Sequence, residues 1–170
     1  MERRLTQEID QETGTVLREW HRLNGRLHRE ATAGASYISR DKETGIIIEE
    51  RYHWNGKLHR EDGPASLTRN LYGVVTWEIY YRHGLIHRDP DEGPAYMERN
   101  WSGTVVRMSA YRLYGEAYRH PDVGPWCIGR CPETGKVQSQ QYLKVEELFD
   151  PSRPPRRRPS GSHSKPPSPK

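Results

Sequence analysis

The sequence predicts an all-β fold: an elongated, single-layer, twisted antiparallel sheet built from tandem hairpin repeats of roughly 30 residues, followed by a disordered basic C-terminal tail. Three observations predict it. Glycines recur at a nearly constant spacing, β-branched residues cluster after them, and the composition is too polar for a large core. Hydrophobic residues make up 32% of the 170 residues and charged residues 29%, and the mean hydropathy is −1.04. Such a composition favours a thin sheet, in which every side chain lies near water.

Residues 1–13 are assigned to an N-terminal segment, and the pattern over Glu2–Glu12 is weakly helical at best. No stretch of the chain approaches the roughly 18 apolar residues of a membrane-spanning helix. Residues 1–10 lack the apolar core of a signal peptide. We therefore expect a cytoplasmic protein with no membrane span, in which the two cysteines are reduced.

Residues 14–150 are predicted to form the β-hairpin repeat domain. The spacing of the opening glycines is 31, 28, 30 and 32 residues, so units start near residues 14, 45, 73, 103 and 135. A second pattern, His59-Arg60-Glu61-Asp62-Gly63-Pro64-Ala65, has a close relative at residues 87–95 and weaker copies at 28–35 and 118–125. Each unit has too few apolar residues to be stable alone, so neighbouring units must stack.

Each unit is predicted to contain strands joined by two turns. Clusters of β-branched residues such as Ile46-Ile47-Ile48 and Val74-Val75-Thr76 favour strands. Asn24-Gly25 and Asn55-Gly56 favour tight turns, because both residues tolerate positive φ. Aligned positions predict the core layers, and they are His21, Tyr52, Tyr80 and Tyr111, then Ile38, Leu67, Met97 and Ile128, then Val16, Ile47, Val75 and Val105.

A recurring arginine is expected to lie on the same face as one of these apolar layers. Arg40, Arg69, Arg99 and Arg130 each follow the apolar layer by two residues, so strand alternation puts them on its face. Their guanidinium groups can then reach Glu19, Glu50 or Glu78 on an adjacent strand. This pattern indicates a ladder of ion pairs along the sheet.

Residues 151–170 carry the basic charge of the chain. The tail holds Arg153, Arg156, Arg157, Arg158, Lys165 and Lys170 and no acidic residue, whereas the remaining residues have 21 basic and 23 acidic side chains. Pro, Ser, Gly and Arg dominate this tail, and no apolar side chain anchors it, so it is predicted to be disordered. It could contact nucleic acid or an acidic partner through the four arginines, or serve only as a solubilising terminus.

The second unit carries a resemblance to a known repeat family. Tyr52-His53-Trp54-Asn55-Gly56-Lys57-Leu58 resembles the Tyr-x-x-Asn-Gly-Lys core of MORN-variant repeats. The following residues 59–65 are similar to the tandem HREDGPA repeats of bacterial, phage and large-virus proteins. The resemblance implies a sheet of β-hairpin repeats with a binding or scaffolding role, and such proteins include proposed antitoxin components. It implies no catalytic residues.

The His-Arg pairs His28-Arg29, His59-Arg60 and His87-Arg88 are the first candidate binding residues. Stacked in register, they would form a row that serves either as a ligand or acid-base site or as part of the scaffold. In the scaffold interpretation the imidazole bonds a neighbouring backbone carbonyl, and the arginine pairs with the acid that follows it. A residue repeated in every unit serves the repeat, whereas a catalytic site needs one copy, so the scaffold interpretation is preferred.

Trp54 and Trp101 lie next to predicted turns and are the second pair of candidate binding residues. Exposed aromatic side chains near arginine are typical of protein-binding surfaces. Cys127 and Cys131 form one C-x₃-C pair without a second pair, so no zinc site is predicted. No motif for a cofactor, a metal or a catalytic nucleophile is present, and none of these is expected.

These observations leave three hypotheses for function. The first is a non-enzymatic repeat module that mediates protein–protein interaction, with an antitoxin-like or phage-related role as an extension of the resemblance. The second is a nucleic-acid-associated factor anchored by the basic tail. The third is a hydrolase that uses the His-Arg row. The exposed sheet edges could also allow self-association.

Overall fold

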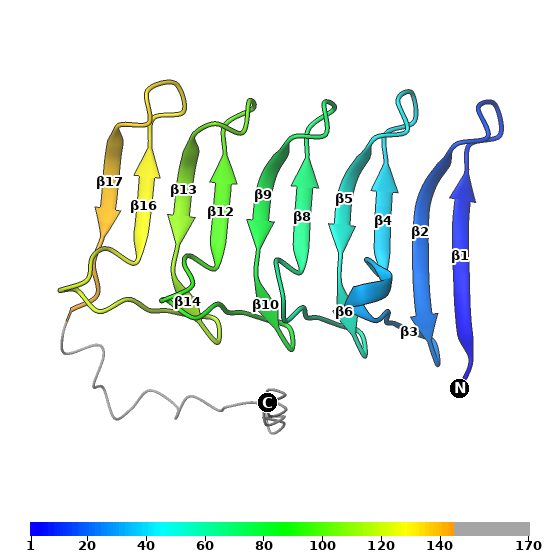
Figure 1. Ribbon diagram of the computed structural model, residues 1–170, viewed down its shortest axis with the longest axis horizontal. Coiled ribbons are helices and arrows are strands. Elements are labelled where there is room, and N and C mark those ends of the chain that lie inside the picture. Colours follow the sequence, from blue (N-terminus) through cyan, green and yellow to red (C-terminus); the bar gives the residue numbers. More distant parts are fainter. Residues whose placement is uncertain (145–170) are drawn as a thin grey trace, which may run out of the picture.

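The computed structural model describes residues 1–144 as an all-β protein dominated by one large antiparallel sheet of hairpins (Figure 1), which confirms the predicted fold class. The predicted tail lies outside the described residues. In spatial order the main strands are β1 (Arg3–Ile9), β2 (Val16–Leu23), β4 (Tyr37–Arg40), β5 (Ile47–Arg51), β8 (Ser66–Arg69), β9 (Val75–Ile79), β12 (Tyr96–Arg99), β13 (Val106–Ala110), β16 (Cys127–Arg130) and β17 (Val137–Gln141).

Short hairpins extend the lower end of the sheet in the view of Figure 1. They carry the chain from one hairpin of the main sheet to the next. Their strands are β3 (Arg26–Leu27), which pairs with β2, and the pairs β6 (His53–Trp54) with β7 (Lys57–Leu58), β10 (Tyr81–Arg82) with β11 (Leu85–Ile86), and β14 (Arg112–Leu113) with β15 (Glu116–Ala117). A single 3₁₀ turn, η1 (Ala31–Ala33), lies in the first connecting loop. Within residues 1–144 no helix is long and apolar enough to cross a membrane.

The expectation of weak helical character before residue 13 is wrong, because β1 is the first strand of the sheet. It pairs with β2 along its length, with Leu5 opposite His21 and Gln7 opposite Glu19. The Asp10 carboxylate accepts the backbone N–H of Thr13 and closes the turn between the two strands. Asp41 does the same for Thr44 in the next hairpin. The motif Asp-x-x-Thr-Gly occurs at residues 10–14 and 41–45. It is the sequence signal for a hairpin turn, and hairpin formation outweighs the weak helix propensity of residues 2–12.

Each main hairpin contains a register shift just before its upper turn. In the second hairpin, for example, Ser39 lies opposite Glu49 but Arg40 lies opposite Ile47. In the fourth hairpin Arg99 lies opposite Val106. The predicted core layer of Val16, Ile47, Val75 and Val105 is therefore wrong by one residue in this hairpin, where Val106 takes the position expected of Val105. The reason is that this β-bulge position depends on pairing across the hairpin, and glycine spacing does not report it.

The lower turns place a residue with positive φ directly before a glycine. Asn24 and Asn55 have φ of 47° and 49°, which confirms the two predicted Asn-Gly turns. His83 and Tyr114 occupy the corresponding positions with φ of 50° and 52°. This conformation is uncommon for non-glycine residues, although histidine adopts it more often than tyrosine does, so contacts from outside the turn matter most at Tyr114.

Burial is concentrated where the connecting loops return to the sheet. Tyr52, Ala35, Ala65 and Leu67 form a buried hydrophobic cluster. Ala65 is fully buried. Because protein interiors are closely packed, a larger side chain at this position would clash with its surroundings. The predicted apolar layer is therefore only partly buried: Leu67 is buried, whereas Ile38, Met97 and Ile128 are half-buried.

Candidate functional site

The three histidines of the predicted row lie along the lower end of the sheet, and each caps the next lower turn. His28 Nδ1 accepts the backbone N–H of Asn55 at 3.1 Å. His59 Nδ1 accepts that of His83 at 3.2 Å. His87 Nδ1 accepts that of Tyr114 at 3.3 Å. Each donor has positive φ, so the imidazole stabilises the unusual backbone of the neighbouring turn.

A ring contact adds to each of these hydrogen bonds, stacked for His59 and His87 and tilted for His28. The His59 ring stacks on His83 with centroids 4.3 Å apart, and the His87 ring stacks on Tyr114 at 4.2 Å. The His28 ring lies 4.4 Å from Trp54. The predicted row of histidines therefore exists, but the imidazole accepts a backbone N–H instead of bonding a carbonyl. That part of the scaffold interpretation is wrong, because the partner belongs to the next turn.

The protonation state of the row follows from this geometry. A nitrogen that accepts an N–H must carry a lone pair, so Nδ1 is unprotonated and the neutral ring carries its proton on Nε2. For His28 and His59, Nε2 lies 3.9 Å from the carboxylates of Glu30 and Glu61. Neither ring nitrogen then offers a free lone pair for proton abstraction. The geometry favours a scaffold role over acid-base chemistry.

The arginines of the row pack on aromatic rings of the preceding strand end. The guanidinium carbon lies 4.1 Å from the Tyr52 ring centroid for Arg60 and 4.0 Å from the Tyr80 centroid for Arg88. Arg88 also donates to the Pro94 carbonyl. In Arg29, the guanidinium contacts the His21 ring instead. The predicted pairing of each arginine with the acid directly after it, Glu30, Glu61 or Asp89, is not found in the described residues, and Arg60 instead bonds Asp62 two residues on. The main partners are otherwise rings and carbonyls.

The loop glycine leaves room for these arginines. A Cβ atom at Gly93 would lie 3.1 Å from Arg88 Nη1, and the φ of 125° at this residue already disfavours a side chain. In this recurring loop the histidine therefore accepts a hydrogen bond from the next turn, the arginine packs on an aromatic ring, and the glycine leaves space for the arginine side chain.

A pH dependence follows from the burial of these histidines. Burial lowers the pKa of His53, His59 and His87 below the ordinary 6.5. Below pH 6.5 the unfolded chain therefore binds more protons, so the free energy of unfolding falls as the pH drops. Asp10 titrates far lower, since the Thr13 N–H and Lys42 lower its pKa to about 2.

We expect the melting temperature to stay constant above about pH 7 and to fall between about pH 6.5 and 5. Thermal melts by circular dichroism at constant ionic strength measure it. A double variant, His59→Asn with His87→Asn, keeps an acceptor but removes two titrating rings, so its melting temperature should fall less over this range. An equal fall in both proteins would contradict the assignment.

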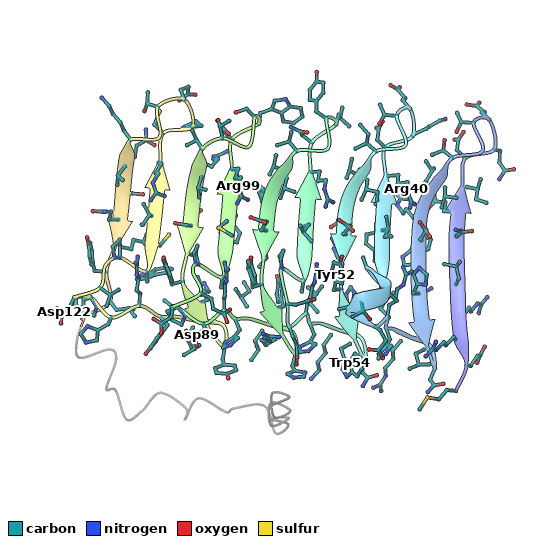
Figure 2. All side chains as sticks on the ribbon, in the orientation of Figure 1. Arg40, Tyr52, Trp54, Asp89, Arg99 and Asp122 are labelled. Carbon is teal, nitrogen blue, oxygen red and sulfur yellow. The ribbon has the colours of Figure 1, made fainter. Side chains whose placement is uncertain are left out.

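The two candidate tryptophans lie at opposite ends of the sheet and do not form one site. Trp54 is 39% exposed and lines a groove of about 580 Å³ at the lower end, together with Arg29, His59 and His83. Figure 2 shows Trp54 at this lower edge. Trp101 is 61% exposed in an upper turn, where its ring meets Tyr72 edge-on.

One face of the main sheet, here the charged face, carries the predicted ion-pair ladder. Arg40 forms an ion pair with Glu19 and Arg69 with Glu50, each with an N–O distance of 2.5 Å, and Arg99 both pairs with and donates to Glu78. Arg40 and Arg99 occupy matching positions in Figure 2. The charges of these pairs neutralise each other, although Arg69 Nη1 makes no hydrogen bond within residues 1–144.

The opposite face, here the aromatic face, was missed by sequence reasoning. Cross-strand register places Trp77, Glu98 and Met108 in one row, and alternation puts Tyr96 on the same face. Trp77 is 42% exposed and Met108 39% exposed, and the Trp77 and Tyr96 rings meet edge-on with centroids 6.0 Å apart. Strand alternation was the available signal, but only register across strands groups these residues.

A second aromatic cluster lies on the same face towards the N-terminus. Trp20 lies opposite Tyr37, and the two ring centroids are 6.0 Å apart. Arg51 lies opposite Tyr37 on its other side and reaches over its ring. The aromatic face is thus defined by Trp20, Tyr37, Arg51, Trp77, Tyr96 and Met108.

The remaining predicted residues form no further site in the described part of the chain. Cys127 is buried and Cys131 half-buried, and both are free thiols. No cluster of metal-ligating side chains is found among residues 1–144. Arg153, Arg156, Arg157 and Arg158 lie outside the described residues. Comparison with known proteins finds no matching family model, no matching curated protein and no matching solved structure.

Proposed function

We propose that this chain is a non-enzymatic, cytoplasmic module that binds another protein through its aromatic face. The observation that carries the proposal is the half-exposed cluster of Trp77, Tyr96 and Met108 in the middle of an open sheet face. Tryptophan, tyrosine and methionine are enriched at protein interfaces, and binding energy concentrates in such central aromatic residues.

Two observations within the molecule support the choice of this face. Ion pairs occur on both faces, since Arg51 pairs with Glu49 and Arg107 with Glu98 on the aromatic side, so the feature that distinguishes the aromatic face is its exposed rings, with Trp77 42% exposed. The histidines of the lower edge are engaged by backbone N–H groups, which argues against the hydrolase hypothesis. The MORN-variant resemblance supports a binding role, and an antitoxin-like or phage-related partner would extend it.

Affinity capture from a lysate of the native host, with mass spectrometry of the retained proteins, tests the proposal. Trp77→Ala should lose specific partners that the unaltered protein retains, whereas Trp101→Ala, which removes a more exposed tryptophan outside the aromatic face, should keep them. Both variants should show the unaltered circular dichroism spectrum. Retention of the same proteins by Trp77→Ala would refute the aromatic face as the site.

A truncated chain without residues 151–170 separates the nucleic-acid hypothesis. If the full chain retains nucleic acid and the truncated chain does not, while protein capture is independent of Trp77, the tail-anchored alternative holds instead. Loss of protein capture in Trp77→Ala together with unchanged capture by the truncated chain supports the proposal.

A further inference from the structure

The edge strand β1 is complementary in sequence to itself. Within the described residues it pairs on one side only, with β2, so its other side presents unpaired backbone groups. Its seven residues read Arg-Arg-Leu-Thr-Gln-Glu-Ile. In an antiparallel arrangement centred on Thr6, Arg4 of one copy lies opposite Glu8 of the other, and Leu5 lies opposite Gln7. The charges change sign about the centre, so this pairing joins opposite charges.

The phase of the backbone hydrogen bonds permits this register. The Asn24 N–H donates to the Glu2 carbonyl, and residues 2 and 24 continue the β1–β2 register. Hydrogen-bonding groups alternate along an antiparallel strand, so Arg4, Thr6 and Glu8 face β2 and the odd-numbered residues 3, 5, 7 and 9 face outward. Pairing about Thr6 joins residue 5 with 7 and residue 3 with 9, which are all outward-facing, and it would displace the Gln11 side-chain amide that donates to the Ile9 carbonyl.

Two arginines that face each other within the chain indicate that an acidic side chain would be favourable beside them. Arg4 lies directly opposite Arg22 on β2, and like charges in this position destabilise a strand pair. No ion pair of either arginine is found in residues 1–144, although Glu2 lines the same groove of about 440 Å³ beside them. Glu8 is held by Arg18 at 2.6 Å, yet its side chain is 44% exposed. In the antiparallel pairing about Thr6, this exposed carboxylate of a second copy would lie opposite Arg4.

We propose that two copies of this chain associate through antiparallel β1–β1 pairing about a two-fold axis at Thr6, which joins their sheets edge to edge. The interface is isologous, so each Arg4–Glu8 contact occurs twice. Added backbone hydrogen bonds supply affinity and the charges select the register. Pairing of β1 with β17 of another copy would instead be heterologous and would grow into filaments.

Sedimentation equilibrium of the full chain, with two charge variants, tests the dimer. Arg4→Glu sets glutamates opposite each other across the interface, and Glu8→Lys sets a lysine opposite Arg4. Each variant alone should raise the dimer dissociation constant about tenfold or more, because two contacts become repulsive. Mixing the two variants should restore a dimer, since every contact across the mixed interface joins opposite charges.

Two control variants make the result decisive. Gln140→Lys places a charge on the exposed far-edge strand β17 and should leave the dimer intact. Thr6→Lys sets two lysines opposite each other at the centre of the interface without removing an internal ion pair, and it should also give monomers. This variant keeps the dimer testable if Glu8→Lys, which loses its pairing with Arg18, does not fold. A monomeric unaltered protein, growth beyond the dimer, or a mixture that stays monomeric would overturn the proposal. Trp77 lies far along the sheet from β1, so the aromatic-face proposal is tested independently.

Discussion

Replacing Tyr52 with alanine should lower the free energy of unfolding by about 3 kcal/mol. The side chain is 8% exposed and packs in the buried cluster with Ala35, Ala65 and Leu67. Its ring also supports the Arg60 guanidinium, 4.1 Å from the ring centroid. Alanine leaves a cavity where the returning loop meets the sheet, and the backbone cannot close it without breaking the hydrogen bond from the Tyr52 N–H to the Ala65 carbonyl.

Trp101→Ala is the matched control, because it also removes a large ring but from an exposed upper turn. We expect a loss of no more than about 0.5 kcal/mol there. Equilibrium unfolding in urea, followed by circular dichroism, measures both variants. A larger loss for Trp101→Ala than for Tyr52→Ala would show that the buried cluster at the lower end of the sheet is wrongly identified.

His59→Ala should cost about 2 kcal/mol, because it leaves the His83 N–H without its acceptor and removes the stacked ring. The His59 side chain is only 12% exposed, so its removal also takes away the packing against the His83 ring. His83 holds a φ of 50°, and without the cap this turn should relax. Amide hydrogen exchange at His83 measures the relaxation, and urea unfolding measures the loss of stability.

His120→Ala is the control for the histidine row. His120 lies in the corresponding loop of the fourth unit, its side chain is 47% exposed, and its nearest partner is Asp122 in the same loop. We expect a change within about 0.5 kcal/mol. His59→Asn should recover part of the loss, since an amide oxygen can accept the same N–H. Equal losses for His59→Ala and His120→Ala would contradict the cap.

The sequence predicted the scaffold well because its signals are local. Each lower turn needs two successive residues with positive φ, and Asn-Gly meets that need within the dipeptide itself. The arginine ladder was predicted for the same kind of reason: Arg40, Arg69 and Arg99 follow their apolar layer by two residues, and strand alternation then fixes their face. The helical expectation for residues 2–12 failed because pairing with β2 outweighs weak propensity.

The candidate site was only half predictable. The histidine row was recognised, but its acceptor role depends on a backbone N–H that lies 24 to 27 residues further along the chain. Tyr114 takes the place of an asparagine in one of these turns, and nothing in its own dipeptide indicates positive φ. The aromatic face required the register that sets Trp77 beside Glu98 and Met108 on two other strands.

The sequence alone therefore determined the all-β class, the period of the hairpins and the position of the turns, since glycine, asparagine and β-branched residues act through their own backbone. Only the tertiary structure decided which side chains share a face, which backbone group each histidine caps and which strands lie at the edges of the described sheet. These properties depend on the register between strands, and a shift of one residue would turn every side chain of a strand to the other face.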